Sequence, residues 1–300
     1  MKYTLHFLIL ISLFLFGCIG TNTNSKTDNY PITNFKVINK FETGFENESE
    51  FTKFSVTPQN YLGSTRHELS SENIHSGELA HKAIIYAENN VVERTNTNHR
   101  GYPTIQLYKT EQGTFTGKVF TEFWVWLDVP IEQKPNANWF SFATFTSYAD
   151  DRWARTELAN LEKDGIVHLV HVPRQGEKED DIFQTTETKF PMRKWVKLSI
   201  LIDYENNNEY NSAYAKVWQD NELVSAARFN PRLDAETIKQ YSAGLECLTT
   251  WDGENVAQAE ELCNLHYTGG LAQAHFGMYA PPLIASGTVY NDDLVIMQIE

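Results

Sequence analysis

Apolar and polar residues alternate along much of the chain with the period of two that is typical of β-strands. In residues 115–129, FTGKVFTEFWVWLDV, the odd-numbered side chains from Val119 to Leu127 fall on one face. The β-branched and aromatic residues of this segment favour a strand. Similar runs predict further strands at 139–146, 166–172, 195–204, 214–219, 223–229, 274–279 and 288–299.

Turn-forming residues separate these runs, as in Lys163-Asp164-Gly165 and Asp220-Asn221. Many short strands with few helical stretches predict an all-β, antiparallel β-sandwich. We expect one helical insertion at about 233–266, with 234–241 and 255–263 as candidate helices. No repeat or second domain is evident, so 35–300 is expected to fold as a single domain.

Composition narrows the function classes. The chain has 300 residues, of which 41% are hydrophobic and 13% aromatic, so general disorder is excluded. Its formal net charge is −14, which argues against nucleic acid as a partner because phosphate binding needs a cationic surface. The same charge argues against docking on anionic lipid through basic residues. We expect a monomer.

The first residues predict export. Lys2 precedes an apolar run from Leu5 to Phe16, and this short run followed by a small residue is typical of a secretory signal at 1–17. The sequence Leu15-Phe16-Gly17-Cys18 resembles the lipobox of bacterial lipoproteins, so Cys18 is predicted to carry lipid. The polar residues 18–34 would then form a flexible tether at the extracytoplasmic side of the cell envelope. The alternative is an ordinary signal peptide with a chance cysteine.

Two cysteines remain, Cys247 and Cys263, and both lie in the expected insertion. In an exported chain an isolated pair most simply forms a disulfide, which here would pin the insertion. Two free buried thiols are the alternative.

Several catalytic motifs are absent from the sequence. It contains no HExxH, phosphate-binding loop, dinucleotide fingerprint or GxSxG. It also lacks the ExDxE pattern that places two carboxylates beside one glycosidic bond. Retaining glycosidase chemistry is therefore disfavoured.

Three segments resemble concanavalin-like carbohydrate-active jelly rolls. Residues 72–83 (ENIHSGELAHKA) resemble an early strand of these proteins, and 214–224 (YAKVWQDNELV) resemble a hairpin. Residues 275–296 (HFGMYAPPLIASGTVYNDDLVI) resemble the closing strands. The order and spacing are similar to those of heparin-lyase-like and alginate-lyase-like proteins over roughly 40–300. The resemblance implies a jelly roll with its site on a concave sheet face.

For a polysaccharide lyase, the resemblance implies a cation and an amide that neutralise a uronate carboxylate, with histidine or tyrosine as base and acid. Arg100 and Gln106 are the candidates for neutralising the carboxylate. Tyr279 and one of His168 and His171, which have opposite strand parity, are the candidates for base and acid. The chain departs from the alginate-lyase pattern because it has no Arg-x-Glu-x-Arg and no lysine in its C-terminal motif.

Further residues are candidates for substrate binding. Tyr102 and Tyr108 share strand parity with Gln106, and aromatic rings with amides suit a sugar-binding face. Trp153 lies between Arg152 and Arg155 in a charged segment, where a ring has little reason to be buried.

Acidic residues near the two ends of the domain indicate a structural calcium site. Glu42, Asp292 and Asp293 resemble the first-strand and last-strand acids of related sandwiches, and calcium prefers several oxygen ligands. No cofactor is expected for catalysis.

The sequence thus favours a lipid-anchored polysaccharide lyase that cleaves uronate-containing glycan by β-elimination. The first alternative is a non-catalytic, lectin-like module that binds glycan without cutting it. A purely structural envelope protein is a third class. Lyase chemistry requires the cation, amide and proton-transfer groups to converge on one uronate, whereas a binding module needs only aromatic rings and amides.

Overall fold

A computed structural model describes most of the chain: residues 30–54, 61–89, 98–131, 138–146, 156–172, 180–181, 187–204, 213–229 and 270–300. Residues Pro31–Glu300 form one compact unit. Some predictions lie outside the described residues: the signal segment with Cys18, the insertion with Cys247 and Cys263, and the segment that contains Arg152, Trp153 and Arg155. In the part of the chain that is described, no helix is long and apolar enough to cross a membrane.

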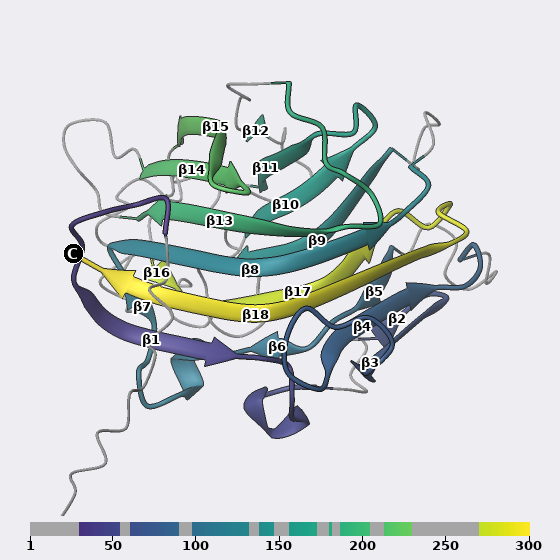
Figure 1. The fold of residues 1–300 in the computed structure, drawn as a ribbon, viewed down its shortest axis with the longest axis horizontal. Coiled ribbons are helices and arrows are strands. Elements are labelled where there is room, and N and C mark those ends of the chain that lie inside the picture. The colour runs from purple at the N-terminus through teal and green to yellow at the C-terminus, as the bar shows by residue number, and fades with distance from the viewer. Residues whose placement is uncertain are drawn as a thin grey trace, which may run out of the picture. The chain divides into compact units, whose positions relative to one another are not determined.

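The strands form two antiparallel sheets, of which sheet A contains the longest strands (Figure 1). In spatial order its strands are β15 (Glu222–Phe229), β14 (Ala213–Gln219), β13 (Trp195–Asp203), β8 (Lys118–Asp128), β18 (Gly287–Ile299), β4 (Ala80–Ile85) and β3 (Thr65–Ser70). Strand β1 (Val37–Thr43) also pairs with β18, beside the half that β4 leaves open.

Sheet B runs in the order β12 (Asp180–Asp181), β11 (Val167–Val172), β10 (Thr156–Glu162), β9 (Trp139–Thr146), β17 (Gln273–Ala280), β5 (His99–Gly101) and β2 (Tyr61–Leu62). The short strand β6 (Thr104–Ile105) continues β5 along β17. Strands β16 (Gly270–Leu271) and β7 (Phe115–Thr116) form a separate pair. Two short 3-10 helices, η1 (Glu48–Glu50) and η3 (Leu107–Lys109), complete the described elements.

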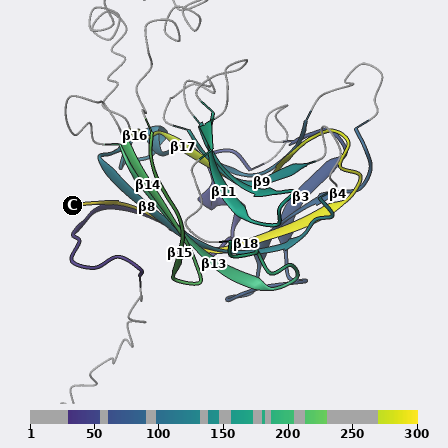
Figure 2. The ribbon, with the colours of Figure 1, turned by 90° about the horizontal axis from the view of Figure 1, so that it is seen from above.

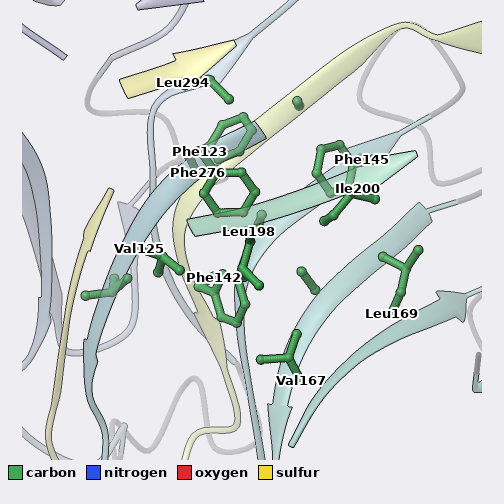
Figure 3. Close-up of a cluster of buried hydrophobic side chains, with 14 of the residues drawn as sticks. Phe123, Val125, Phe142, Phe145, Val167, Leu169, Leu198, Ile200, Phe276 and Leu294 are labelled. Carbon is green, nitrogen blue, oxygen red and sulfur yellow. The ribbon is translucent and has the colours of Figure 1, made fainter. Parts of the chain in front are cut away.

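The two sheets pack face to face around one hydrophobic core. Phe123 of β8 meets Phe276 of β17 edge to face, with ring centroids 5.1 Å apart, a geometry that aromatic pairs prefer. Figure 3 shows Leu198 and Ile200 of β13 on the sheet A side of this core, with Val167 and Leu169 on the sheet B side. Because side chains alternate along a strand, each strand of sheet B also presents residues on the face that points away from sheet A. We call this the outer face of sheet B; it lies on the concave side of the curved sheets (Figure 2).

The all-β antiparallel prediction is confirmed. The predicted strand at 139–146 matches β9 residue for residue, and those at 195–204 and 288–299 match β13 and β18 to within one residue at each end. Strand β10, in the middle of sheet B, was not predicted from the sequence.

Candidate functional site on the outer face of sheet B

Arg100 and Tyr279 lie directly opposite each other on adjacent strands. Strand register pairs Tyr279 of β17 with Arg100 of β5 on one side and with Ser141 of β9 on the other. Ser141 pairs in turn with Asn160 of β10, and Asn160 with His168 of β11. The neighbours of Tyr279 along its strand, Met278 and Ala280, belong to the core, so the Tyr279 side chain is on the outer face of sheet B.

The side chains of Arg100 and Tyr279 are in contact. The guanidinium carbon Cζ of Arg100 lies 5.3 Å from the centroid of the Tyr279 ring, within cation–π range. Asn98 donates a hydrogen bond from Nδ2 to the Tyr279 hydroxyl over 2.8 Å. Trp139 packs against the same ring with centroids 5.2 Å apart. Arg100, Tyr279, Asn98 and Trp139 are all half-buried, so this cluster combines a cation, an amide and two aromatic rings at a partly accessible position.

The backbone of β17 beside Tyr279 is irregular. The register between β17 and β9 shifts between Phe276 and Tyr279, and Gly277 has a φ of +145°, which side chains rarely permit. A bulge of this kind re-aims the side chains beside it. Here it separates Tyr279 from His275, which stacks on Tyr102 with ring centroids 4.3 Å apart and an interplanar angle of 8°.

Sequence reasoning missed three members of this region: Asn98, Trp139 and His275. His275 was quoted within the closing-strand motif but was not taken as a site residue, although it shares strand parity with Tyr279 in HFGMY. Parity could therefore have identified it. No local sequence pattern indicates Asn98 or Trp139, because their proximity to Tyr279 arises from strand pairing between distant parts of the chain.

The structure corrects the expectation that Gln106 and Tyr108 continue the strand of Arg100. The chain leaves the sheet after β6, and Gln106 is the N-cap of η3, which contains Tyr108. Gln106 is buried and donates from Nε2 to the Tyr108 hydroxyl over 3.2 Å. Gln106 therefore binds Tyr108 rather than projecting beside Arg100 from the same strand face. Tyr102 does lie in the site region, buried against His275.

His168 lies in the same cross-strand row as Tyr279 but far along it. Three strand spacings separate β11 from β17, which is about 14 Å. His168 Nε2 is 2.9 Å from Asp164 Oδ2. Burial alone would raise the pKa of Asp164, but hydrogen bonds from His168 and from the Ile166 backbone outweigh it and lower that pKa. The backbone of His171 pairs with Glu157 and Asp180, and its side chain is outside the described part.

The three predicted calcium ligands do not converge. Glu42 is exposed on β1, where it pairs with Lys40 over 2.5 Å. Asp292 Oδ2 accepts hydrogen bonds from the backbone N–H groups of His75 and Ser76, over 2.8 and 3.1 Å. Asp293 binds the side chains of the same two residues, each over 2.6 Å. Among the residues that the structure describes, no three His, Cys, Asp or Glu side chains form a group suited to a metal ion.

Comparison with known proteins is informative at the level of fold. No known family model matches the sequence, and no curated protein matches it significantly. Among solved structures, the chain is similar to an endo-β-1,4-glucuronan lyase from the fungus Trichoderma reesei. The TM-score is 0.50 at 10% identity, covering 88% of this chain and 96% of that one.

Two further solved structures match at lower TM-scores. The cellulose-induced protein Cip1 matches with a TM-score of 0.49 at 11% identity, over 85% of this chain and 95% of that one. The alginate lyase AlgAT5 of polysaccharide lyase family 7 matches with a TM-score of 0.40 at 12% identity, over 76% and 83%. The likeness to the glucuronan lyase, at 10% identity, is one of fold alone: both chains are antiparallel β-sandwiches of the jelly-roll type.

Proposed function

We propose that the outer face of sheet B binds a uronate-containing polysaccharide and that the protein is a lyase that cleaves it by β-elimination. The observation that carries the proposal is the contact between Arg100 and Tyr279, with Asn98 on the tyrosine hydroxyl. A guanidinium beside a proton-transferring hydroxyl is the minimum that elimination next to a carboxylate requires. The fold shared with a glucuronan lyase supports the same substrate class.

In the proposed reaction, Arg100 pairs with the uronate carboxylate and draws charge away from the neighbouring C5 carbon. A base removes the C5 proton, the C4–C5 double bond forms, and the bond from C4 to the glycosidic oxygen breaks as that oxygen gains a proton. Tyr279 is the residue placed for proton transfer at the Arg100 end of the sheet. The Asn98 N–H would stabilise negative charge on the phenol oxygen as it develops.

A lectin-like binding module is the second candidate, and one observation favours it. The backbone of His168 is three strand spacings, about 14 Å, from that of Tyr279, and its ring is engaged by Asp164, which argues against His168 and Arg100 acting on one sugar. Half-buried aromatic rings such as Trp139 and Tyr279 suit a module that holds glycan without cutting it.

Ultraviolet absorbance of unsaturated sugar ends, followed during incubation with a panel of polyuronates, tests the two candidates. A lyase produces absorbance with at least one polymer, and Arg100→Ala lowers that rate about 10²- to 10³-fold, the effect of losing one donor to a developing oxyanion. Tyr279→Phe should abolish turnover while binding persists. If the protein binds a polymer but produces no absorbance with any polymer, the lectin-like binding module is the candidate that is supported. Absence of both binding and absorbance contradicts the proposal.

The proposal extends to the setting of the protein. A signal peptide at 1–17 and lipid on Cys18 would hold a monomeric domain at the extracytoplasmic side of the cell envelope, with the membrane contacted only through that lipid. A disulfide between Cys247 and Cys263 would suit this compartment.

A further inference from the structure

A row of polar side chains crosses sheet B away from Arg100. Register places Gln273 of β17 opposite Thr146 of β9, and Thr146 opposite Thr156 of β10. We call these three residues the Gln273 row. Ala274 and Phe145, next to them along their strands, belong to the core, so Gln273 and Thr146 point to the outer face of sheet B. Gln273, Thr146 and Thr156 are all less than 5% exposed.

Two atoms of this row are buried without a hydrogen-bond partner: Gln273 Oε1 and Thr156 Oγ1. A third such atom, Asn160 Oδ1, lies on the same face but in the row of Tyr279, because register pairs Asn160 with Ser141 of β9 and with His168 of β11. Asn160 donates from Nδ2 to Glu162 Oε1 over 3.1 Å, which fixes its free atom as the carbonyl oxygen, an acceptor. Leaving such groups unpaired costs free energy, and proteins rarely tolerate it without a ligand or an ordered water.

The position of these atoms distinguishes them from other unpaired polar atoms of the described residues. Gln219 Oε1, for example, is unpaired on sheet A, at the end of β14. Gln273, Thr156 and Asn160 instead share one face of sheet B, the face of Arg100 and Tyr279. They carry no charge, and the carbonyl and hydroxyl oxygens accept hydrogen bonds from hydroxyl groups.

We propose that Gln273 and Thr156 form a second sugar subsite, which binds hydroxyl groups of a further unit of the glycan whose carboxylate binds Arg100. The inference rests on the proposed function of that site. Ser141, opposite Tyr279, and Thr146, in the Gln273 row, are five residues apart on β9, which is about 16 Å. One sugar ring does not span that distance, so the subsite holds a different unit of the same chain. Gln273 Oε1 and Thr156 Oγ1 have no hydrogen bond that a sugar hydroxyl would have to displace.

The subsite and the Arg100 site recognise different chemistry, which gives a sharp test. Oligomers of glucuronate of increasing length, and the same oligomers with carboxyls reduced to alcohols, are titrated calorimetrically against the full chain in a Tyr279→Phe background, so that turnover does not consume them. Thr156→Val and Gln273→Met keep the side-chain shape and remove the polar atom. Thr121→Val, at a buried threonine of β8 in sheet A, is the matched control.

We expect the Thr156→Val and Gln273→Met variants to weaken binding of long oligomers about fivefold each, whether or not the carboxyls are reduced, which is the effect of one neutral hydrogen bond. Binding of oligomers too short to span about 16 Å should not change. Arg100→Ala should weaken only the native oligomers, and Thr121→Val neither kind.

Three outcomes separate the subsite from the proposed function. If wild type binds long oligomers through Arg100 but Thr156→Val and Gln273→Met bind them equally well, the subsite is wrong and the row holds ordered water only. If the two variants weaken only native oligomers, the row does not recognise hydroxyls as proposed. If wild type binds no oligomer of either kind, the proposed function fails together with the subsite.

Discussion

At the scale of single residues, the position of Tyr279 depends on Gly277. A Cβ atom added to Gly277 would lie 2.3 Å from the Gly101 carbonyl oxygen and 2.9 Å from His81 Cε1. The first contact is with backbone of β5, the strand that carries Arg100, so it cannot be relieved by a side-chain rotation. The φ of +145° adds strain for any residue with a side chain.

Gly277→Ala should therefore destabilise the protein by roughly 2–4 kcal/mol, the range of severe backbone effects. It should also weaken glycan binding by moving β5 away from β17, which separates Arg100 from Tyr279. Urea unfolding measures the first effect and calorimetry on the folded variant the second. Gly113→Ala is a matched control, because Gly113 also has a positive φ but has nothing within 4 Å of its added Cβ. Equal stability of the two variants would contradict the argument.

The residue scale also shows which site predictions the sequence supports. Arg100 and Tyr279 were candidates from residue type and resemblance, and both lie on the outer face of sheet B. The strand of Arg100 does not extend to Gln106, because pairing with β17 ends with β6 at Ile105 and Gln106 is already the N-cap of η3. The sequence does not indicate that Asn98 belongs to the site, because its hydrogen-bond partner Tyr279 is 181 residues away.

At the scale of elements, hydrophobic alternation predicted the long strands well. It missed β10, whose sequence TELANLE contains one β-branched residue and resembles a helical segment in composition. This segment is a strand because β9 and β11 pair with it on both sides. Such tertiary pairing overrides local propensity and cannot be read from the segment itself.

The 71–79 loop shows how the terminal acids act on a neighbouring element. Asp292 is fully buried and accepts backbone hydrogen bonds from His75, Ser76 and Asp293. The ring of His75 then stacks on Trp124, with centroids 3.9 Å apart. These contacts fasten the loop to the strands of sheet A.

Asp292→Ala should destabilise the protein by roughly 3 kcal/mol or more, because three backbone N–H groups lose their acceptor at about 1 kcal/mol or more each. Asp292→Asn keeps one acceptor oxygen and should cost less. Glu68→Ala, at an exposed carboxylate of β3, is the control and should change stability little. Amide hydrogen exchange at residues 75 and 76 locates the effect; unchanged exchange in Asp292→Ala would show that the loop is held by other contacts.

At the scale of the whole molecule, stability should depend on pH through a buried histidine pair. His81 Nε2 and His67 Nδ1 are 3.3 Å apart, and the His67 ring packs on Phe54 with centroids 5.2 Å apart. Burial lowers the pKa of His67 to about 4. Burial first, and then the neighbouring His67, lower the pKa of His81 well below its usual value. Both rings are therefore neutral in the folded protein at pH values where an unfolded histidine is charged.

The resulting pH dependence has a definite sign. An unfolded histidine binds its proton near pH 6.5, whereas folded His67 binds one only near pH 4. Between these values the unfolded state holds more protons, so stability is full above pH 6.5 and falls as the pH drops toward 4. His67 alone accounts for a loss of about 3 kcal/mol. Asp292 has the opposite effect on stability. Burial raises its pKa from 3.8 to about 6, so the folded state binds the proton before the unfolded state does, and stability gains as the pH falls from 6 toward 3.8.

Urea unfolding of wild type, His67→Gln and Asp292→Asn at pH values from 7 to 4 separates the two contributions. His67→Gln retains an acceptor for His81 but cannot titrate, so its stability should fall less steeply on acidification than that of wild type. Asp292→Asn removes the opposing group, so its stability should fall more steeply. If the free energy of unfolding of His67→Gln runs parallel to that of wild type at every pH, the histidine pair is not the cause of the pH dependence. A constant difference in stability reflects packing alone, because the slope with pH depends only on the difference in bound protons between the unfolded and folded states.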